Sequence, residues 1–140
     1  MRFAAMYLLL ACLSACVSAP GSVVPKGQQI QFAQKATRTK VNGGITGRQY
    51  VDYLLQVRAQ QSLKIAFKPD NPSAYFNLLP PASSAALFIG STSGNHYEGA
   101  LRTAGIYIVR VYLMGNAARR SESANYTLEI ELTGDGSTGP

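Results

Sequence analysis

Hydrophobic and polar residues alternate along several short stretches of this 140-residue chain. The clearest stretch is the last one, in which Tyr126, Leu128, Ile130 and Leu132 alternate with Thr127, Glu129 and Glu131. A period of two places every second side chain on one face of a strand, whereas an amphipathic helix repeats about every 3.6 residues. The chain is therefore expected to fold mainly into half-buried β-strands.

The same alternation recurs at 30–32, 51–57, 63–67 and 107–113. Turn signals separate these runs, at 42–44, 69–72, 80–81, 93–95 and 115–116, where Gly, Pro, Asn and Asp gather. Residues 82–89 fit either a helical turn or, at 87–89, a buried strand. Short strands with such breaks predict an all-β fold, a single antiparallel β-sandwich of about eight strands.

The run from Ile106 to Met114 is apolar on both faces except at Arg110. Such a run is typical of a central strand that is covered on both sides. A buried Arg110 needs a partner, for which Asp52 and Glu98 are the candidates. In the alternative that we prefer, Arg110 lies at a strand edge and extends to water.

The N-terminal residues have the layout of an export signal. Arg2 supplies a positive charge, residues 3–13 are apolar apart from Cys12, and small residues follow up to Cys16. The apolar run is too short for a membrane-spanning helix. We expect a signal peptide over 1–15, a linker over 16–28, the β-sandwich domain over 29–133 and a flexible tail over 134–140.

Leu13-Ser14-Ala15-Cys16 resembles the bacterial lipobox, in which the cysteine becomes the first mature residue and carries lipid. The resemblance implies lipidation at Cys16, and Val17 after it, rather than Asp, implies the outer membrane. The alternatives are a lipid site at Cys12 and an ordinary signal cleaved after an alanine, which would release a free domain.

The residue types available exclude most catalytic chemistry. The chain has one histidine, His96, and two cysteines, Cys12 and Cys16, which lie in or beside the signal. A Ser-His-Asp triad, a histidine or cysteine metal site and a thiol nucleophile therefore lack their parts. We expect no enzyme activity, catalytic residue, metal or cofactor. The 13 Lys and Arg residues are scattered rather than clustered with aromatic residues, so we expect no nucleic-acid partner either.

Two polar loops are candidates for a binding surface, because loops on a rigid scaffold commonly carry recognition. Residues 91–98 combine hydroxyl groups, an amide, an imidazole and Tyr97. Residues 115–123 contain Arg119 and Arg120, whose guanidinium groups suit carboxylates. Each loop has a plainer alternative: a polar turn in which Tyr97 starts the next strand, and a solvated hairpin loop partly neutralised by Glu122.

From Ile30 to Leu132 the chain resembles the periplasmic inhibitors of g-type lysozyme. The matching residues are Gly44-Ile45-Thr46-Gly47, Tyr50, Tyr53, Gln61, Tyr75-Phe76, Gly105-Ile106-Tyr107, Arg110-Val111, Asn116, Ala118, Arg119 and Tyr126. The resemblance implies an antiparallel β-sandwich, in agreement with the alternation. It also implies a protein that blocks lysozyme by placing loop side chains in the substrate cleft.

The resemblance assigns contact residues as well. The arginine-bearing loop of the family falls on 115–120, where Asn116 and Arg119 match and Arg120 follows. Tyr50 matches too. The chain departs from the family at Gly115, where an arginine is often found, and at Arg48, where an aromatic residue is often found. These departures bear on which lysozyme is bound and how tightly, and Arg48 or Arg120 is a candidate to compensate.

The segment from Ser93 to Tyr97 is similar to a Ser-Gly…Tyr loop in inhibitors of invertebrate-type lysozymes, which adds Ser93 and Tyr97 to the expected contacts. The expected function is thus a lipid-anchored lysozyme inhibitor on the periplasmic side of the outer membrane, with g-type lysozyme favoured as the partner. The alternatives are a non-inhibitory envelope module that binds glycan or peptidoglycan through exposed tyrosines, and one that binds another envelope protein.

Overall fold

A computed structural model describes residues 25–134. The expected signal peptide, Cys16, most of the expected linker and the tail from residue 135 lie outside these residues. Within 25–134 the chain forms nine strands and two single-turn helices. No helix among them has the length and apolar character needed to cross a bilayer.

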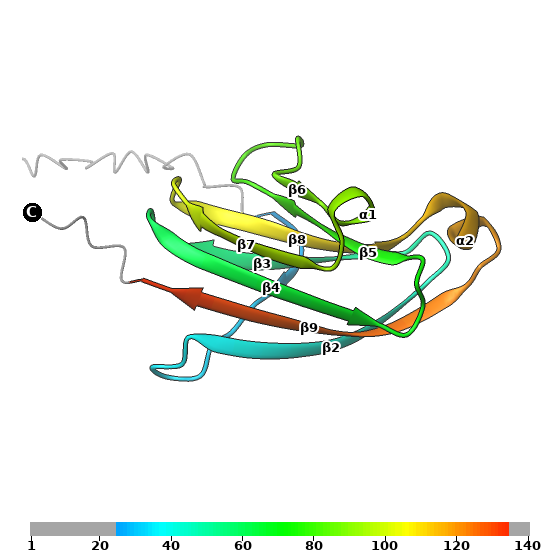
Figure 1. Ribbon diagram of the computed structural model, residues 1–140, viewed down its shortest axis with the longest axis horizontal. Coiled ribbons are helices and arrows are strands. Elements are labelled where there is room, and N and C mark those ends of the chain that lie inside the picture. The colour runs from blue at the N-terminus through cyan, green and yellow to red at the C-terminus, as the bar shows by residue number, and fades with distance from the viewer. Residues whose placement is uncertain (1–24, 135–140) are drawn as a thin grey trace, which may run out of the picture.

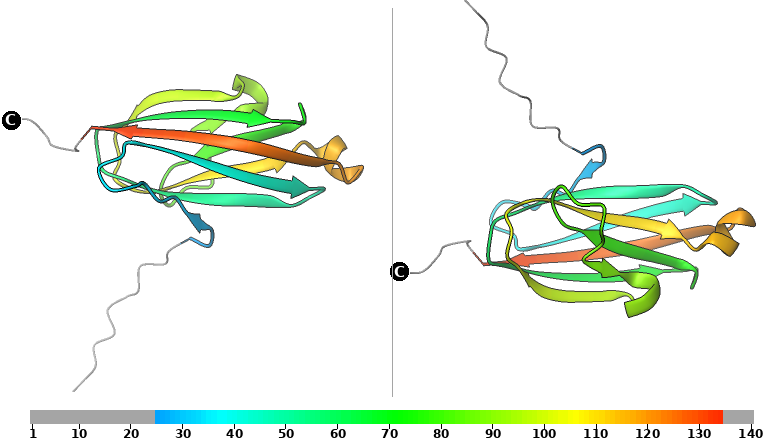
Figure 2. Two further views of the ribbon diagram at one scale, coloured as in Figure 1. Left: turned by 90° about the horizontal axis from the view of Figure 1, so that it is seen from below. Right: turned by 90° about the horizontal axis from the view of Figure 1, so that it is seen from above.

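The strands form two sheets that pack face to face (Figure 1). Sheet A has the order β1 (Gln28–Gln29), β3 (Tyr50–Val57), β8 (Gly105–Leu113), β5 (Ala74–Leu79), β6 (Phe88–Ile89). Sheet B has the order β2 (Arg38–Thr46), β9 (Ser123–Thr133), β4 (Gln61–Pro69), β7 (His96–Leu101). Neighbouring strands are antiparallel except β1 and β3, which pair in parallel over two residues. The expected all-β sandwich is confirmed, with its two layers visible edge-on in Figure 2.

The inward-facing side chains of both sheets form one hydrophobic core. Phe67 of β4 and Phe76 of β5 are 1% and 0% exposed, and their rings meet edge to face with centroids 5.8 Å apart. Burying a side chain of this size stabilises a fold by about 1.5–3 kcal/mol. Strands β3, β4, β8 and β9 coincide with the alternating runs of the sequence, because each of these strands has one face on this core.

Two of the expected strands differ in the structure. Ile30 is buried and its amide bonds to the carbonyl oxygen of Leu54, but the strand ends before it, at Gln29. The expectation of a strand at 87–89 is partly confirmed by β6. That strand lies at the edge of sheet A, so Leu87 and Ile89 are exposed rather than buried.

The preferred position of Arg110 at a strand edge is wrong. Arg110 lies in the middle of β8, the central strand of sheet A, directly opposite Asp52 of β3. Its Nε and Nη2 atoms donate to the two carboxylate oxygens of Asp52 at 2.7 and 2.9 Å. These bonds to Asp52 raise the pKa of Arg110. The cation is therefore paired on the outer face of the sheet, where it is also partly exposed.

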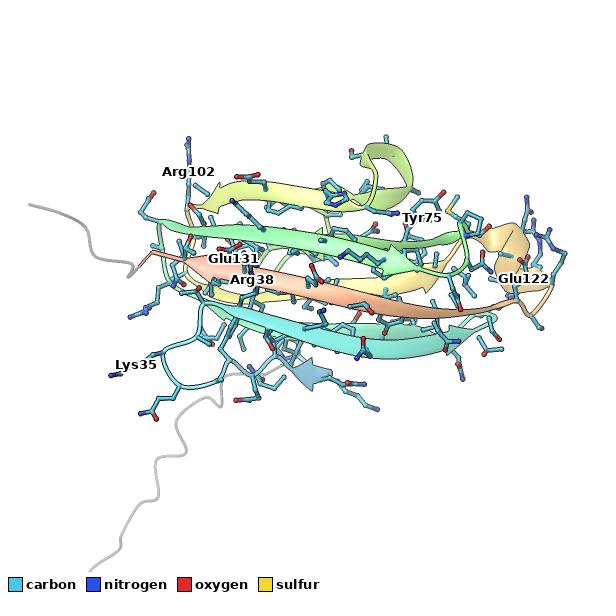
Figure 3. All side chains as sticks on the ribbon, turned by 60° about the horizontal axis from the view of Figure 1, so that its bottom comes forward. Lys35, Arg38, Tyr75, Arg102, Glu122 and Glu131 are labelled. Atoms are coloured by element: carbon cyan, nitrogen blue, oxygen red, sulfur yellow. The ribbon has the colours of Figure 1, made fainter. Side chains whose placement is uncertain are left out.

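The outer face of sheet B carries a ladder of charges of alternating sign. Arg38 pairs with Glu131 at 2.8 Å, and the two side chains lie next to each other in Figure 3. Glu129 lies between Lys40 and Lys68, at 3.3 and 3.2 Å. Hydrogen bonds from Lys68 and then Lys40 lower the pKa of Glu129. This face is solvated, as the alternation in β9 predicts.

Candidate functional site

The connection between β8 and β9 folds into a short, fixed turn. Helix α2 (Gly115–Arg119) is a single turn whose Ala117 is buried in the core. The amide of Ser121 donates to the carbonyl oxygen of Ala118 at 3.1 Å. The amide of Glu122 donates to that of Ala117, also at 3.1 Å. These two bonds, with Ser121 at a φ of 53°, make the Schellman arrangement that ends many helices.

Two neighbouring loops hold this turn in place. The amide of Gly47, in the β2–β3 turn, donates to the carbonyl oxygen of Glu122 at 2.8 Å. The side-chain amide of Asn71, in the β4–β5 loop, donates to the carbonyl oxygen of Ser123 at 3.1 Å. All three connections lie at one end of the sandwich, the end with α2 in Figure 1. The turn is thus anchored from both sides before any partner binds.

Arg119 and Arg120 differ in their surroundings although they are adjacent. Arg120 Nε and Nη2 donate to one carboxylate oxygen of Glu122 at 3.0 and 2.5 Å. Arg119 instead donates to the amide oxygen of Asn116, one turn of helix earlier. The charge of Arg120 is therefore partly neutralised within the loop, and that of Arg119 is not.

A surface hollow of about 310 Å³ lies between the β2–β3 turn and α2, lined by Arg48, Leu113, Gly115, Ala118 and Arg119. Within residues 25–134 neither Arg48 nor Arg119 forms an ion pair. Gly115 leaves the hollow open, since a Cβ there would lie 3.9 Å from Arg119 Nη1. The hollow therefore presents two guanidinium groups beside an apolar floor, which is suited to a carboxylate of a partner.

Tyr50 begins β3 directly after the turn that carries Arg48. Its side chain is 59% exposed, the largest exposure among the exposed large hydrophobic residues of 25–134. The guanidinium carbon of Arg110 lies 4.7 Å from the centre of the Tyr50 ring, within the range of a cation–π contact. Arg110 is held in turn by Asp52, so Tyr50 is an exposed ring on a fixed support.

The second expected loop lies apart from the hollow. Helix α1 (Gly90–Ser93) links the edges of the two sheets, and both views in Figure 2 separate it from α2. Ser93 is exposed, but Tyr97 points inward, with its ring centroid 5.5 Å from that of Phe88. Burial, and then the neighbouring Tyr107, raise the pKa of Tyr97. Tyr97 thus packs as part of β7, which begins one residue earlier at His96, much as in the plainer alternative for this loop.

The structure brings together part of the expected contact set. Arg48 and Arg119 line the hollow, and Asn116 accepts a hydrogen bond from Arg119. Tyr50 follows Arg48 by two residues and lines a different hollow. Arg120 turns to Glu122, and Ser93 and Tyr97 lie elsewhere. Sequence reasoning missed Gly47 and Asn71 as the residues that anchor the turn. Asn71 lies in the turn expected at 69–72, and Gly47 entered only through the family resemblance. Neither signal says which loop a residue anchors. Contact with a partner stays a prediction for all seven residues.

Residues 25–134 contain few other side chains suited to catalysis or metal binding. Within 25–134 no group of three or more His, Cys, Asp or Glu side chains is placed to hold a metal ion. His96 is exposed at the start of β7. What remains is a two-sheet β-sandwich with a rigid, cationic loop end, a scaffold suited to contacting another macromolecule.

This scaffold resembles the solved structures of several lysozyme inhibitors. It is similar to PliG of Aeromonas hydrophila, a periplasmic lysozyme inhibitor of g-type lysozyme, with a TM-score of 0.71 and 26% identity over 76% of this chain and 96% of that one. It is also similar to PliG of Salmonella Typhimurium, with a TM-score of 0.61 and 22% identity over 79% of this chain and all of that one.

A PliG mutant from Escherichia coli has a TM-score of 0.60 and 20% identity over 77% of this chain. The last two likenesses concern the fold alone. No family model matches the sequence, and no curated protein is detectably similar to it. The resemblance to periplasmic inhibitors of g-type lysozyme, drawn from sequence motifs, is confirmed by the likeness to the Aeromonas hydrophila structure. All three neighbours are described as inhibitors of lysozyme.

Proposed function

We propose that this protein is a periplasmic inhibitor of lysozyme, with g-type lysozyme as the favoured target. The observation that carries the proposal is the likeness to the Aeromonas hydrophila inhibitor, which extends over 96% of that chain at 26% identity. A fold by itself does not fix a function. The rigid turn at the α2 end adds a site whose chemistry suits inhibition.

In the proposed mechanism, Arg119 enters the substrate cleft of the lysozyme. Lysozyme catalysis depends on a carboxylic acid whose protonation state is tuned by its surroundings. A guanidinium group beside that acid forms charge-assisted hydrogen bonds and occupies the space of the sugar. Because the turn is anchored through Gly47 and Asn71, little conformational entropy is lost when it enters the cleft.

Arg48 serves as the second cation in this mechanism. The family often has an arginine at the position of Gly115, which here has no side chain. Arg48 reaches the same hollow from the neighbouring turn. Tyr50, two residues after Arg48, and Asn116, which binds Arg119, complete the proposed contact surface. Arg120 contributes less because Glu122 binds it.

A turbidity assay tests this function. Lysis of a peptidoglycan suspension by g-, c- and i-type lysozymes is followed with the protein in excess. Selective loss of g-type activity is the expected result. Loss of c-type or i-type activity instead would indicate a changed specificity, which we would assign to Arg48 and Gly115. Full activity of all three with a folded protein would contradict the proposal.

The proposal places the mature protein on the periplasmic side of the outer membrane, held by lipid on Cys16. One acyl chain binds membranes only marginally, so stable anchoring takes more than one. Substitution of Cys16 by Ser is expected to move the protein out of the membrane fraction after cell lysis, while Cys12→Ser leaves it there. Membrane retention of the Cys16→Ser protein would contradict the anchor.

A further inference from the structure

Three tyrosines form a row across the outer face of sheet A. Tyr50 of β3 and Tyr75 of β5 are each directly opposite Tyr112 of β8. Their sequence neighbours Val111 and Phe76 point into the core, which places the three rings on the outside. The Tyr75 and Tyr112 rings lie with centroids 6.5 Å apart and are tilted by 41°. The Tyr50 ring lies against Arg110 instead, with the guanidinium carbon 4.7 Å from its centre. The aromatic strip therefore consists of the Tyr75–Tyr112 pair and a third exposed ring, Tyr50, on the same face.

Polar side chains form the next row on the same face. Asp52, Arg110 and Asn77 are opposite one another on β3, β8 and β5. The Tyr112 hydroxyl donates to Asn77 Oδ1 at 3.1 Å, and Arg110 is bound to Asp52. These contacts fix the direction of a carboxylate, a guanidinium and an amide beside the aromatic strip. None of the described contacts uses the amide nitrogen of Asn77.

The charge around this strip is positive. Lys26 lines a hollow with Tyr50 and Asp52 on one side. Arg48 lies in the β2–β3 turn, two residues before Tyr50, where β3 begins. The carboxylate on this part of the face, Asp52, is only 11% exposed and already paired with Arg110. An occupant with carboxylate groups therefore meets two cations at the Tyr50 end of the strip.

We infer that this row is a glycan-binding surface, and that its ligand is the peptidoglycan strand. Sugar rings have an apolar face that packs on aromatic rings and hydroxyl groups that bond to planar polar side chains, which the two rows supply. The carboxylates of peptidoglycan complement Lys26 and Arg48. The choice of peptidoglycan among anionic glycans rests on the proposed periplasmic location.

This surface adjoins the hollow at α2 and shares Tyr50 and Arg48 with the contact surface proposed there, whereas Tyr75, Tyr112 and Asn77 belong to the glycan surface alone. Figure 3 shows Tyr75 toward the same end of the sandwich as Glu122. The protein would thus bind the substrate of a lysozyme with one face while the adjoining loop end meets the enzyme. Anchoring an inhibitor on the strand under attack raises its local concentration there.

Co-sedimentation of the mature protein with purified peptidoglycan tests the inference. Wild-type protein is expected in the pellet, and release by added salt is expected to be partial, because stacking is less sensitive to salt than charge pairing. Tyr75→Ala is expected to bind about tenfold more weakly, a loss typical of one stacked ring. Tyr75→Phe/Tyr112→Phe keeps both rings and is expected to bind like the wild type.

Matched variants separate this site from the inhibitory one. Arg119→Ala is expected to sediment like the wild type, while Tyr75→Ala inhibits lysozyme like the wild type. Thermal melts of each variant exclude unfolding as the cause of a loss. The inference would be overturned if wild-type protein were absent from the pellet. Unchanged binding by folded Tyr75→Ala and Tyr75→Ala/Tyr112→Ala would also overturn it, as would tighter binding to single-stranded DNA through the same rings. Failure to inhibit any lysozyme would leave this result unaffected.

Discussion

The amide of Gly47 donates a hydrogen bond to the carbonyl oxygen of Glu122 across 75 positions of sequence, at 2.8 Å. This bond ties the β2–β3 turn to the end of the β8–β9 connection. It sets Arg48 against Arg119 on the two sides of one hollow. The relative position of the two cations therefore depends on the backbone of Gly47.

Replacing Gly47 by Ala is expected to destabilise the fold by about 1–2 kcal/mol, because its φ of 59° is left-handed and any Cβ is strained there. Urea unfolding measures the change. Gly115→Ala is the matched control, since a Cβ there has nothing closer than 3.9 Å, and its effect should stay within about 0.5 kcal/mol. Equal effects of the two substitutions would contradict the argument.

Ser121→Gly is expected to have the opposite effect. Ser121 has a φ of 53° at the end of α2, where glycine is the favoured residue. Removing the Cβ relieves strain, so the free energy of unfolding should rise by about 0.5–1 kcal/mol after the entropy of glycine is counted. Ser123→Gly, within β9, should lower it instead. A loss of stability in Ser121→Gly would show that its side chain makes contacts that outweigh the strain.

The sequence predicted the sandwich because each long strand has one face on the core, which leaves a period-two pattern. It did not predict β1, whose two residues are too few to carry a pattern. The turn expected at 42–44 was wrong, because these residues lie inside β2, where Gly43 leaves room for the Tyr126 hydroxyl. The edge position preferred for Arg110 was wrong because strand order is a tertiary property. Asp52 lies 58 residues away, and the register of β3 on β8 brings it opposite.

The candidate site was predicted only in part, and the reason is again that tertiary geometry is not visible in the sequence. Arg119 and Arg120 are equivalent in the sequence, and only the geometry of the turn directs Arg120 to Glu122. Tyr97 was a candidate contact because Ser93 to Tyr97 is similar to a loop of inhibitors of invertebrate-type lysozymes. Its inward position depends on β7 lying next to β4 at the edge of sheet B, where its ring meets Phe88.

Arg119→Ala is expected to weaken inhibition of g-type lysozyme by about thirtyfold, because an arginine that fills a cleft contributes about 2 kcal/mol or more at such interfaces. Arg120→Ala should weaken it by less than about threefold, since Glu122 already binds that side chain. Inhibition constants from the turbidity assay measure both. A larger loss from Arg120→Ala would reverse the assignment of the two residues.

The ion pair between Asp52 and Arg110 is expected to stabilise sheet A. Arg110→Met leaves a carboxylate that is 11% exposed without its two hydrogen bonds, so a loss of about 1–2 kcal/mol is expected in urea unfolding. The matched control is Lys64→Met, which breaks an exposed pair to Glu98 at 3.5 Å and should cost less than about 0.5 kcal/mol. Similar losses from both would mean that the Asp52 pair contributes no more than a surface pair.

Alkaline pH is expected to destabilise the fold through a buried pair of tyrosines. The hydroxyl groups of Tyr53 and Tyr126 share a hydrogen bond of 2.7 Å between the two sheets, beneath Gly43, where a Cβ would lie 2.5 Å from the Tyr126 hydroxyl. Burial, and then the bond to Tyr53, raise the pKa of Tyr126 far above its ordinary value. The folded state thus keeps this proton at a pH where the unfolded chain loses it.

A raised pKa in the folded state gives stability that is complete below the unfolded value, about 10, and is lost as pH rises toward the folded value. The free energy of unfolding should therefore fall above pH 10 by up to about 1.4 kcal/mol per pH unit for this group. Tyr126→Phe should lower the free energy of unfolding by about 1 kcal/mol at pH 7. It should also make the decline above pH 10 less steep, because one titrating group is gone. Urea unfolding between pH 8 and 11 measures both, and Tyr75→Phe, an outer-face tyrosine, serves as the control. Parallel curves for wild type and Tyr126→Phe would show that Tyr126 is not the group that titrates.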